Sequence, residues 1–354
     1  MTTAASTPGA DFYTNLGPSG LKVSRIILGT MTFGKRSWSD WIIEDKDQVF
    51  AILKKAYDAG IRTFDTADSY SNGYSEIFIG DFLKKYNIKR DRVVILSKIF
   101  FPYDPDMEGF SQKTRDSFPV VEYLNSQGLS RKHIFDSAKG INERLGTYPD
   151  VIQIHRFDPN TPMEETMEAL HDIVKLGLTR YIGASTMKTY QFVMLQSIAE
   201  RRGWTKFISM QNYYNLLYRE EEPEMIEYCK LTGVSVIPWS PNARGILTRP
   251  LGVAGETNRI NGDKHRLEKL GLSELSEADQ TILRRVEEIA NKYNKPMAVI
   301  STAYVLSKGL SPIVGCSKPE RVDDAIEAFY FHKQLTAEDI AYLEEPYVHK
   351  EWTS

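Results

Sequence analysis

Short apolar runs rich in β-branched residues recur along the chain, and each run is bounded by turn residues. The eight runs are residues 24–29, 62–67, 93–98, 151–156, 181–185, 208–215, 234–240 and 312–317. Most of them are apolar at nearly every position rather than at alternate positions, which is typical of parallel strands covered on both faces. The runs therefore predict eight buried, parallel strands.

The segments between these runs show the periodicity of helices with one apolar face. In residues 46–60, Val49, Leu53 and Ala56 fall on the same face, and Gly60 ends the pattern. Further helices are predicted over residues 75–86, 130–146, 164–177, 188–202, 221–231, 277–294, 297–308, 319–330 and 336–345. Because strands and helices alternate, we expect an α/β fold of the (β/α)8 type, a TIM barrel, with additional helices.

The N-terminal segment and two long insertions add to this barrel. Residues 12–24 hold two strand-like ends around a Gly-Pro-Ser-Gly turn, which predicts an N-terminal β-hairpin below the barrel. We expect residues 1–10 to be a disordered tail and residues 11–354 to form a single barrel domain. The insertions 100–128 and 242–275 follow strand ends, so they are candidate lids over the active face.

The composition is that of a globular protein. Apolar residues make up 42% of the sequence, with 19 Tyr, 16 Phe and 5 Trp, which is enough for a large core and excludes intrinsic disorder. The 44 basic and 47 acidic residues give a net charge of −3, so no overall field attracts nucleic acid or an anionic membrane. We therefore expect neither a nucleic-acid partner nor a membrane partner.

Searches for common motifs exclude several kinds of site. Cys229 and Cys316 have no paired spacing and the six histidines include no H-x-x-x-H pair, so we expect neither a disulfide framework nor a metal site. Residues 29–36 are similar to a phosphate-binding P-loop, but Arg36 stands where that motif needs a magnesium-binding hydroxyl, so a P-loop is excluded. No G-x-G-x-x-G motif follows a predicted strand, which also excludes a Rossmann dinucleotide site. Without a signal-peptide pattern or a long apolar run, a cytoplasmic location is expected.

Four ionisable residues fall at or just after the ends of consecutive predicted strands: Asp65, Tyr70, Lys98 and His155. A barrel brings the carboxyl ends of its strands to one mouth, so these side chains should meet. A lysine ammonium favours the ionised form of a nearby phenol, which would make Tyr70 a proton donor near neutral pH. Asp65 would hold Lys98 charged and oriented, and His155 would orient a carbonyl oxygen.

Each of these residues also has an ordinary structural interpretation. Asp65 and Lys98 could form an ion pair that only stabilises the barrel rim, and His155 and Tyr70 could be polar rim residues without a chemical role. Their coincidence at the ends of three adjacent strands favours a catalytic site.

The later strands supply the residue types of a cofactor site. Ser185, Gln211 and Trp239 offer hydrogen bonds and one aromatic face, which suit a nicotinamide ring. The 242–275 insertion adds six basic residues, Arg244 among them, against four acidic ones. For this loop alone, a solvated charged lid is an equally good interpretation.

A phosphate site is predicted after the eighth strand. Ser317, Lys318 and Arg321 surround a helix start at Pro319. Free backbone N–H groups and the helix dipole favour an anion at such a position.

These residues together resemble the aldo-keto reductase family over nearly the whole chain, from about residue 12 to 345. The matching blocks are FDTADSY (64–70), LSKI (96–99), IQIHR (152–156), GAS (183–185), QNYYN (211–215), PWSPNARG (238–245) and IVGCSKPERVDDAI (313–326). The branch they resemble contains aryl-alcohol dehydrogenases, bacterial general stress reductases and potassium-channel β subunits. The resemblance implies an NADP-bound (β/α)8 barrel with the tetrad Asp65, Tyr70, Lys98 and His155, in which the tyrosine donates a proton as hydride reaches a carbonyl carbon.

The resemblance also implies how the cofactor is held. Ser185 and Gln211 would bind the nicotinamide carboxamide, and Trp239 would stack on the ring. Arg244 and the neighbouring loop backbone would meet the pyrophosphate, and Ser240 is a further cofactor-binding residue. The residues implied for the adenosine 2′-phosphate are Ser317, Lys318 and Arg321.

Two sites lack an amide of the family pattern, and at a third site Gly315 stands where some members have Lys, so phosphate recognition must rest on the residues just after it. Thr186 replaces the usual Asn after the motif serine, and Asp324-Ala325 replaces the usual Glu-Asn that contacts adenine. Each substitution removes an amide from the expected cofactor contacts.

The sequence as a whole predicts NADPH-dependent reduction of an aldehyde or a ketone, with a small carbonyl compound as the partner molecule. The alternative is an NADPH-binding regulatory subunit that acts mainly through protein contacts, because such subunits can keep the tetrad. The sequence leaves the substrate and the oligomeric state open.

Overall fold

Eight parallel strands form the central sheet of the computed structural model, which describes residues 8–104, 106–107, 109–110, 114–253 and 264–353. The strands are β3 (Ile27–Gly29), β4 (Thr63–Asp65), β5 (Val94–Ile99), β6 (Val151–Ile154), β7 (Tyr181–Ser185), β8 (Phe207–Gln211), β9 (Ser235–Val236) and β10 (Ile313–Gly315). Their order in the sheet is β10-β3-β4-β5-β6-β7-β8-β9.

Hydrogen bonds between the two outer strands close this sheet. The N–H of Ser311 donates to the carbonyl oxygen of Val236 at 3.2 Å, and the N–H of Ile313 donates to that of Pro238 at 2.8 Å. The predicted (β/α)8 barrel is confirmed.

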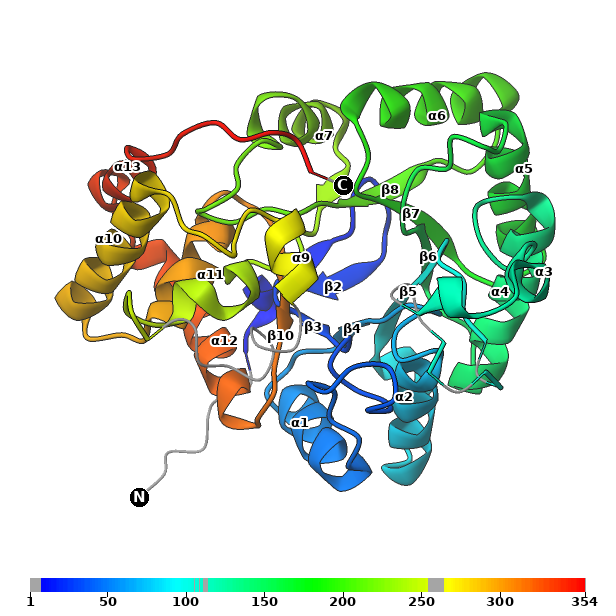
Figure 1. Cartoon of the computed structure of the whole chain (residues 1–354), viewed down its shortest axis with the longest axis horizontal. Coiled ribbons are helices and arrows are strands. Elements are labelled where there is room, and N and C mark those ends of the chain that lie inside the picture. Colours follow the sequence, from blue (N-terminus) through cyan, green and yellow to red (C-terminus); the bar gives the residue numbers. More distant parts are fainter. Residues whose placement is uncertain (1–7, 105, 108, 111–113, 254–263, 354) are drawn as a thin grey trace.

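A ring of helices surrounds the barrel (Figure 1). These helices are α1 (Lys46–Asp58), α2 (Tyr74–Lys85), α4 (Arg131–Leu145), α5 (Met163–Lys175), α6 (Thr189–Arg202), α7 (Glu227–Thr232), α11 (Met297–Ser307) and α12 (Glu320–Phe331). Two additional helices, α10 (Glu277–Tyr293) and α13 (Ala337–Glu344), extend the structure, with α10 packed on α11 and α13 on α10.

Local capping signals set the ends of these helices. The Asp45 side chain accepts the N–H of Asp47 at the start of α1, and the Ser130 side chain accepts that of His133 at the start of α4. Gly146 ends α4 in the left-handed conformation, with φ of +64°. Because such signals are local, the predicted helices match the observed ones closely, although the segment before α7 is a π-helix, η4 (Glu222–Ile226).

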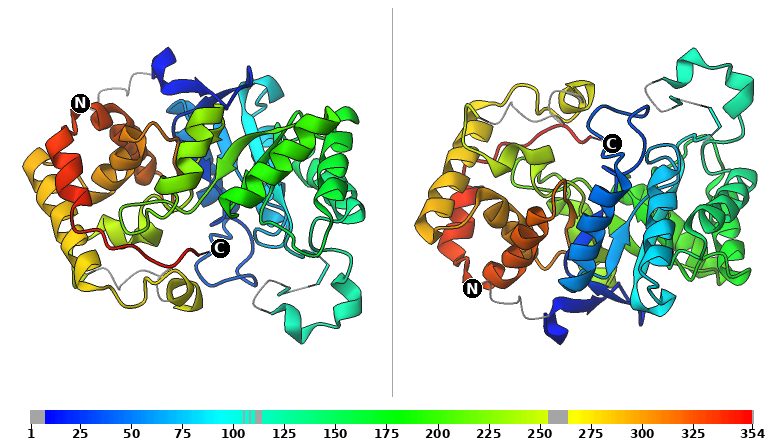
Figure 2. Two further views of the ribbon diagram at one scale, coloured as in Figure 1. Left: turned by 90° about the horizontal axis from the view of Figure 1, so that it is seen from above. Right: turned by 90° about the horizontal axis from the view of Figure 1, so that it is seen from below.

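An antiparallel hairpin of β1 (Tyr13–Asn15) and β2 (Lys22–Ser24) lies at one end of the barrel (Figure 2). Leu16 and Val23 of this hairpin pack against side chains from the barrel interior. Those side chains are Ile27, Leu96, Val151, Ile208, Ile237 and Ile313. The hairpin therefore covers the amino ends of the strands, as predicted.

The predicted disordered tail falls mostly outside the described residues, which begin at Pro8. The side chain of Pro8 is buried, and a 3-10 helix, η1 (Ala10–Phe12), follows it. Within the described parts of the chain, no helix is both long enough and apolar enough to cross a membrane.

The two long insertions lie at the end of the barrel opposite the hairpin (Figure 2). Their short helices are η3 (Arg115–Ser117) and α3 (Val120–Tyr123) after β5, and η5 (Ala243–Thr248) and α9 (Lys264–Lys269) after β9. Two further 3-10 helices are η2 (Arg90–Arg92) and η6 (His332–Gln334). The insertions thus stand where the lids were predicted.

Candidate active site

A cavity of about 570 Å³ opens at the carboxyl ends of the strands. Eleven of the twelve residues singled out in the sequence line it: Asp65, Tyr70, His155, Ser185, Gln211, Trp239, Ser240, Arg244, Ser317, Lys318 and Arg321. The twelfth, Lys98, is fully buried and bonded to two of them. The fold therefore brings the predicted catalytic and cofactor residues to one place.

The Lys98 ammonium connects the predicted catalytic residues. Lys98 lies on β5, and its Nζ donates to Asp65 Oδ2 at 2.6 Å, to the carbonyl oxygen of Thr66 at 2.8 Å and to the Tyr70 hydroxyl at 3.2 Å. All three ammonium protons thus have acceptors inside the barrel. Burial opposes the charge of Lys98, but Asp65 and Tyr70 outweigh it and raise the pKa of the lysine.

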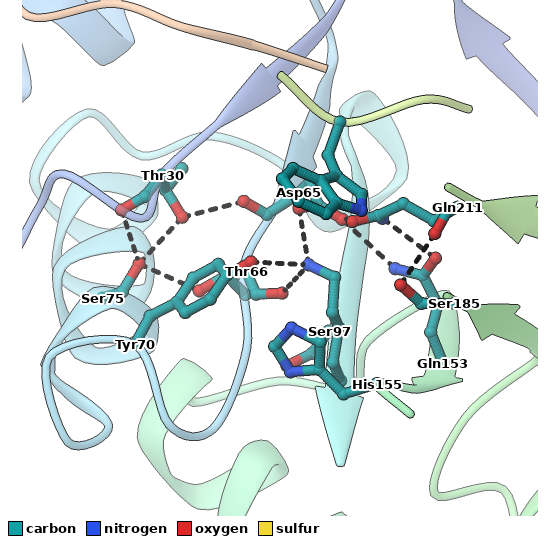
Figure 3. A network of polar contacts seen from close by, with 12 residues as sticks. Thr30, Asp65, Thr66, Tyr70, Ser75, Ser97, Gln153, His155, Ser185 and Gln211 are labelled. Atoms are coloured by element: carbon teal, nitrogen blue, oxygen red, sulfur yellow. Dashed lines mark hydrogen bonds and ion pairs between the residues drawn. The ribbon is translucent and has the colours of Figure 1, made fainter. Parts of the chain in front are cut away.

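The Asp65 carboxylate is held by more than the lysine. Its second oxygen, Oδ1, accepts from Gln211 Nε2 at 2.8 Å and from Gln153 Nε2 at 3.2 Å (Figure 3). The two glutamines also bond to each other at 3.1 Å. This network fixes the position of Asp65 beneath the cavity and connects it to Gln211, a predicted cofactor residue.

Tyr70 lies in the loop between β4 and α2, with its side chain half-buried. Behind it, Thr30, Thr66 and Ser75 share hydroxyl hydrogen bonds of 2.8 to 2.9 Å (Figure 3). Because Ser75 is in the first turn of α2, these bonds tie the loop to the barrel. The Tyr70 hydroxyl accepts from Lys98, so its own proton remains available to a group in the cavity.

The His155 ring meets the edges of two aromatic rings. The ring centres of Tyr70 and Phe101 lie 5.8 and 4.8 Å from that of His155. Burial, together with the charges of Arg156 and Lys98, holds the pKa of His155 well below its usual range. The imidazole is therefore neutral at neutral pH, and its Nδ1 has no hydrogen-bond partner among the described residues. An unpartnered buried nitrogen, in a ring that packs edge-to-face on that of Tyr70, suits a polar atom of a bound molecule.

On the cofactor side, Trp239 presents one face to the cavity. Its other face stacks on Tyr213, with ring centres 4.5 Å apart and planes at 26°. The indole Nε1 donates to Thr186 Oγ1 at 3.2 Å, and Ser185 Oγ donates to the carbonyl oxygen of Gln211 at 2.8 Å. Thr186, the first departure from the family pattern, therefore helps to position the tryptophan.

The turn after Trp239 has strained backbone at residues other than glycine. Ser240, Ala243 and Arg244 have φ of +58°, +44° and +57°. Each such residue costs about 1 kcal/mol or more, and such strain is concentrated at functional sites. The N–H of Arg244 donates to Ser240 Oγ at 2.9 Å, which helps to hold this turn against the cavity.

At the predicted phosphate end, an acidic residue faces the basic ones. Arg321 Nη1 donates to Asp324 Oδ2 at 2.9 Å, and Asp324 lines the cavity. Asp323 instead pairs with Lys55, at 2.8 Å. Lys318 and Ser317 are exposed just before α12. The N–H groups of Arg321 and Val322 already donate to the carbonyl oxygens of Lys318 and Pro319, at 3.1 and 3.0 Å, so an anion here would be favoured by the basic side chains and the helix dipole rather than by these N–H groups.

Sequence reasoning missed three residues that border the catalytic group. Gln153 stands two positions before His155, so strand alternation already places both on the same face. Arg156 and Arg266 line the cavity, but where they meet depends on the course of the loop that carries α9. Within the described residues, no three His, Cys, Asp or Glu side chains are placed to hold a metal ion.

Comparison with known proteins identifies the family. Residues 25–347 match the profile described as "Aldo/keto reductase family". The chain belongs to this family.

Relatives in this family are similar along almost the whole chain. A Schizosaccharomyces pombe protein provisionally named an aryl-alcohol dehydrogenase is 54% identical over 95% of this chain and 96% of its own length. An Aspergillus parasiticus protein named versiconal hemiacetal acetate reductase is 49% identical over 96% of this chain and 97% of its own. An Alternaria alternata aldo-keto reductase, AMT2, is 46% identical over 95% of this chain and 91% of its own. Family membership and these reductase names support an oxidoreductase that acts on small carbonyl compounds.

Proposed function

We propose that this chain reduces aldehydes or ketones to alcohols with NADPH as the hydride donor. The observation that carries the proposal is the buried Lys98 ammonium, which joins Asp65 to the Tyr70 hydroxyl beside a neutral His155. All of these groups except the lysine border the same cavity as the predicted cofactor residues.

In this mechanism the substrate carbonyl oxygen lies between Tyr70 and His155. When bound, NADPH supplies the hydride that reduces the carbonyl carbon. Tyr70 donates its hydroxyl proton to the carbonyl oxygen, and the Lys98 ammonium stabilises the phenolate that remains. Asp65 keeps that ammonium in place, and the His155 ring orients the oxygen by a hydrogen bond.

The residues on the cofactor side fit a nicotinamide dinucleotide. Trp239 has one free face for the ring, and Ser185 and Gln211 have polar groups beside it. Arg244 and the strained turn suit the pyrophosphate. Lys318 and Arg321, with the start of α12, suit a 2′-phosphate and so favour NADPH over NADH.

The test is NADPH oxidation by the purified protein across aromatic aldehydes, aliphatic aldehydes and ketones. We expect turnover with at least one class, faster with NADPH than with NADH. NADPH binding without turnover of any carbonyl compound would favour the regulatory subunit instead. The cytoplasmic location stays a prediction, which fractionation of the source cells would check.

A further inference from the structure

A group of positive charges lies beside the catalytic residues and has no role in the mechanism above. Arg156 directly follows His155 at the end of β6, and Arg266 is on α9. Both line the cavity that also contains Tyr70 and His155. Lys269 is one helical turn further along α9.

These two arginines have no acidic partner among the described residues. The side-chain hydrogen bond of Arg156 runs from Nη1 to the carbonyl oxygen of His155, at 2.6 Å, and its guanidinium is 5.5 Å from the Phe101 ring centre. By contrast, Arg144, which is also poorly exposed, forms an ion pair with Glu76 at 2.6 Å. An arginine that is half-buried without a carboxylate is uncommon, because desolvation of its charge is left uncompensated.

The charges also repel one another. Burial and the nearby Arg266 lower the pKa of Arg156 to about 9. The pKa of Lys269 is also lowered, mainly by burial and further by the charges of Arg156 and Arg266. A bound anion would relieve this repulsion and supply the acceptor that the guanidinium groups lack.

The cofactor phosphates belong to a different part of the barrel. Ser317 and Lys318 follow β10, whereas Arg156 follows β6. In the closed sheet order β10-β3-β4-β5-β6-β7-β8-β9, these two strands are four places apart in either direction, so they stand on opposite sides of the mouth. Arg156 is therefore on the side of the proton donors, where a substrate would extend. Arg266 comes from the insertion after β9, and its charge acts on Arg156 across the same cavity.

We propose that Arg156 and Arg266 form a subsite for a carboxylate on the substrate, so the preferred substrates are aldehydes or ketones that carry a carboxylate group. This inference rests on the proposed carbonyl reduction and specifies its substrate class. A planar guanidinium pair matches the geometry of a carboxylate better than a single lysine does.

The test compares two aldehydes of similar shape, 4-formylbenzoate and its methyl ester, of which the ester is neutral and larger by one methyl group, together with the 3-formyl pair. The wild-type protein should favour the carboxylate over the ester by about tenfold or more in kcat/KM for one of the pairs, as a charge-assisted hydrogen bond implies. In Arg266→Met this preference should disappear, because kcat/KM should fall much more for the carboxylate than for the ester. Arg266→Lys should keep part of the preference.

Two further variants sharpen this test. Arg156→Met should lose the preference in the same way. Because Arg156 is not on α9, a local rearrangement of that helix in Arg266→Met could not explain a loss that both variants share. Lys139→Met, an exposed residue of α4 outside the cavity, changes the net charge equally and should behave as wild type.

Equal kcat/KM for acid and ester in the wild-type protein, for both pairs, would overturn the subsite. So would a loss of NADPH affinity in Arg266→Met without a change in substrate preference, because the arginine would then serve the cofactor. If no aldehyde is reduced at all, the proposed function fails, and calorimetric titration of benzoate into the NADP-bound protein still decides on the subsite. Binding that is lost in Arg266→Met would support it, and absence of binding to the wild-type protein would overturn it.

Discussion

Lys98 uses all three of its ammonium donors within the catalytic group, on Asp65, Thr66 and Tyr70. None of these bonds reaches solvent, since the Lys98 side chain is fully buried. Its charge is therefore a structural element of the barrel and, in the proposed mechanism, the feature that makes Tyr70 a proton donor.

We predict that Lys98→Met lowers kcat for carbonyl reduction by about a hundredfold or more, because the phenolate loses the cation that stabilises it. In the reverse reaction, alcohol oxidation, the rise of activity with pH should move to higher pH. The variant should also lose about 3 kcal/mol of stability, because Asp65 is left as an uncompensated buried charge. Steady-state kinetics against pH, with thermal unfolding alongside, provide the check; an unchanged pH profile would remove Lys98 from the mechanism.

If the chain uses NADPH as proposed, the Arg321–Asp324 ion pair of α12 should influence the cofactor preference. Asp324→Asn frees Arg321 for a 2′-phosphate, so the ratio of kcat/KM for NADPH to that for NADH should rise about twofold or more, as expected for an exposed pair. Arg321→Ala should lower the same ratio by about tenfold. Asp323→Asn is the matched control, since that carboxylate pairs with Lys55. A fall of the ratio in Asp324→Asn would contradict the assignment.

At the scale of elements, the C-terminal tail after α13 binds to the segment before η4. Trp352 Nε1 donates to Glu221 Oε1 at 3.1 Å, and the N–H of Lys350 donates to Glu220 Oε1 at 2.8 Å. The other oxygen of Glu221 accepts from Asn212 Nδ2 at 2.7 Å, next to Gln211 of the cavity wall. The tail is thus tied to the strand that carries a predicted cofactor residue.

Burial raises the pKa of Glu221 to about 8. At pH values between the ordinary pKa of a glutamate and 8, Glu221 is protonated in the folded state and ionised in the unfolded state. The contribution of this carboxyl group to stability therefore falls as the pH rises through that range. Glu221→Gln stays neutral, so its stability relative to wild type should increase by more than about 1 kcal/mol from acidic to alkaline pH. Thermal unfolding at an acidic and an alkaline pH measures this difference, with the exposed Glu224→Gln as the control. An equal change in stability between the two pH values for wild type and Glu221→Gln would refute the prediction.

The barrel and its helices could be predicted because their signals are local. Apolar runs marked the strands, and caps such as Ser130 and Gly146 marked the helix ends. The tetrad followed because a barrel brings strand ends together wherever they occur in the sequence.

Other parts of the site depend on loop geometry that no local pattern encodes. The left-handed turn at Ser240 and Arg244 contains no glycine at those positions, so nothing in the sequence marks its strain. The approach of Arg266 to Arg156 depends on how α9 folds back over the mouth. The Arg321–Asp324 pair was equally hidden, because three acidic side chains stood near Arg321 and only the fold selects among them.

At the scale of the whole molecule, the cavity has a charge opposite to that of the chain. The net charge is −3, yet the basic residues on the cavity wall are Arg36, Arg156, Arg244, Arg249, Arg266, Lys318 and Arg321. The acidic residues there are Asp40, Asp65 and Asp324. A cleft lined mainly by one sign of charge concentrates ligands of the other sign.

NADPH binding should therefore weaken as salt screens the cavity. We expect the Kd of NADPH to rise several-fold from low to high ionic strength, measured by quenching of tryptophan fluorescence. The KM of a neutral aldehyde should change little over the same range. A salt-independent Kd would contradict an electrostatic role in NADPH binding for the predicted cofactor residues Arg244, Lys318 and Arg321.

The measurement that tests the central claim most directly is the rate of carbonyl reduction by Tyr70→Phe, set beside its NADPH affinity. The phenylalanine keeps the ring and removes only the hydroxyl that receives the Lys98 hydrogen bond. The account predicts that kcat falls by about a hundredfold or more while the Kd of NADPH stays close to that of wild type. Turnover at the wild-type rate in Tyr70→Phe would contradict it.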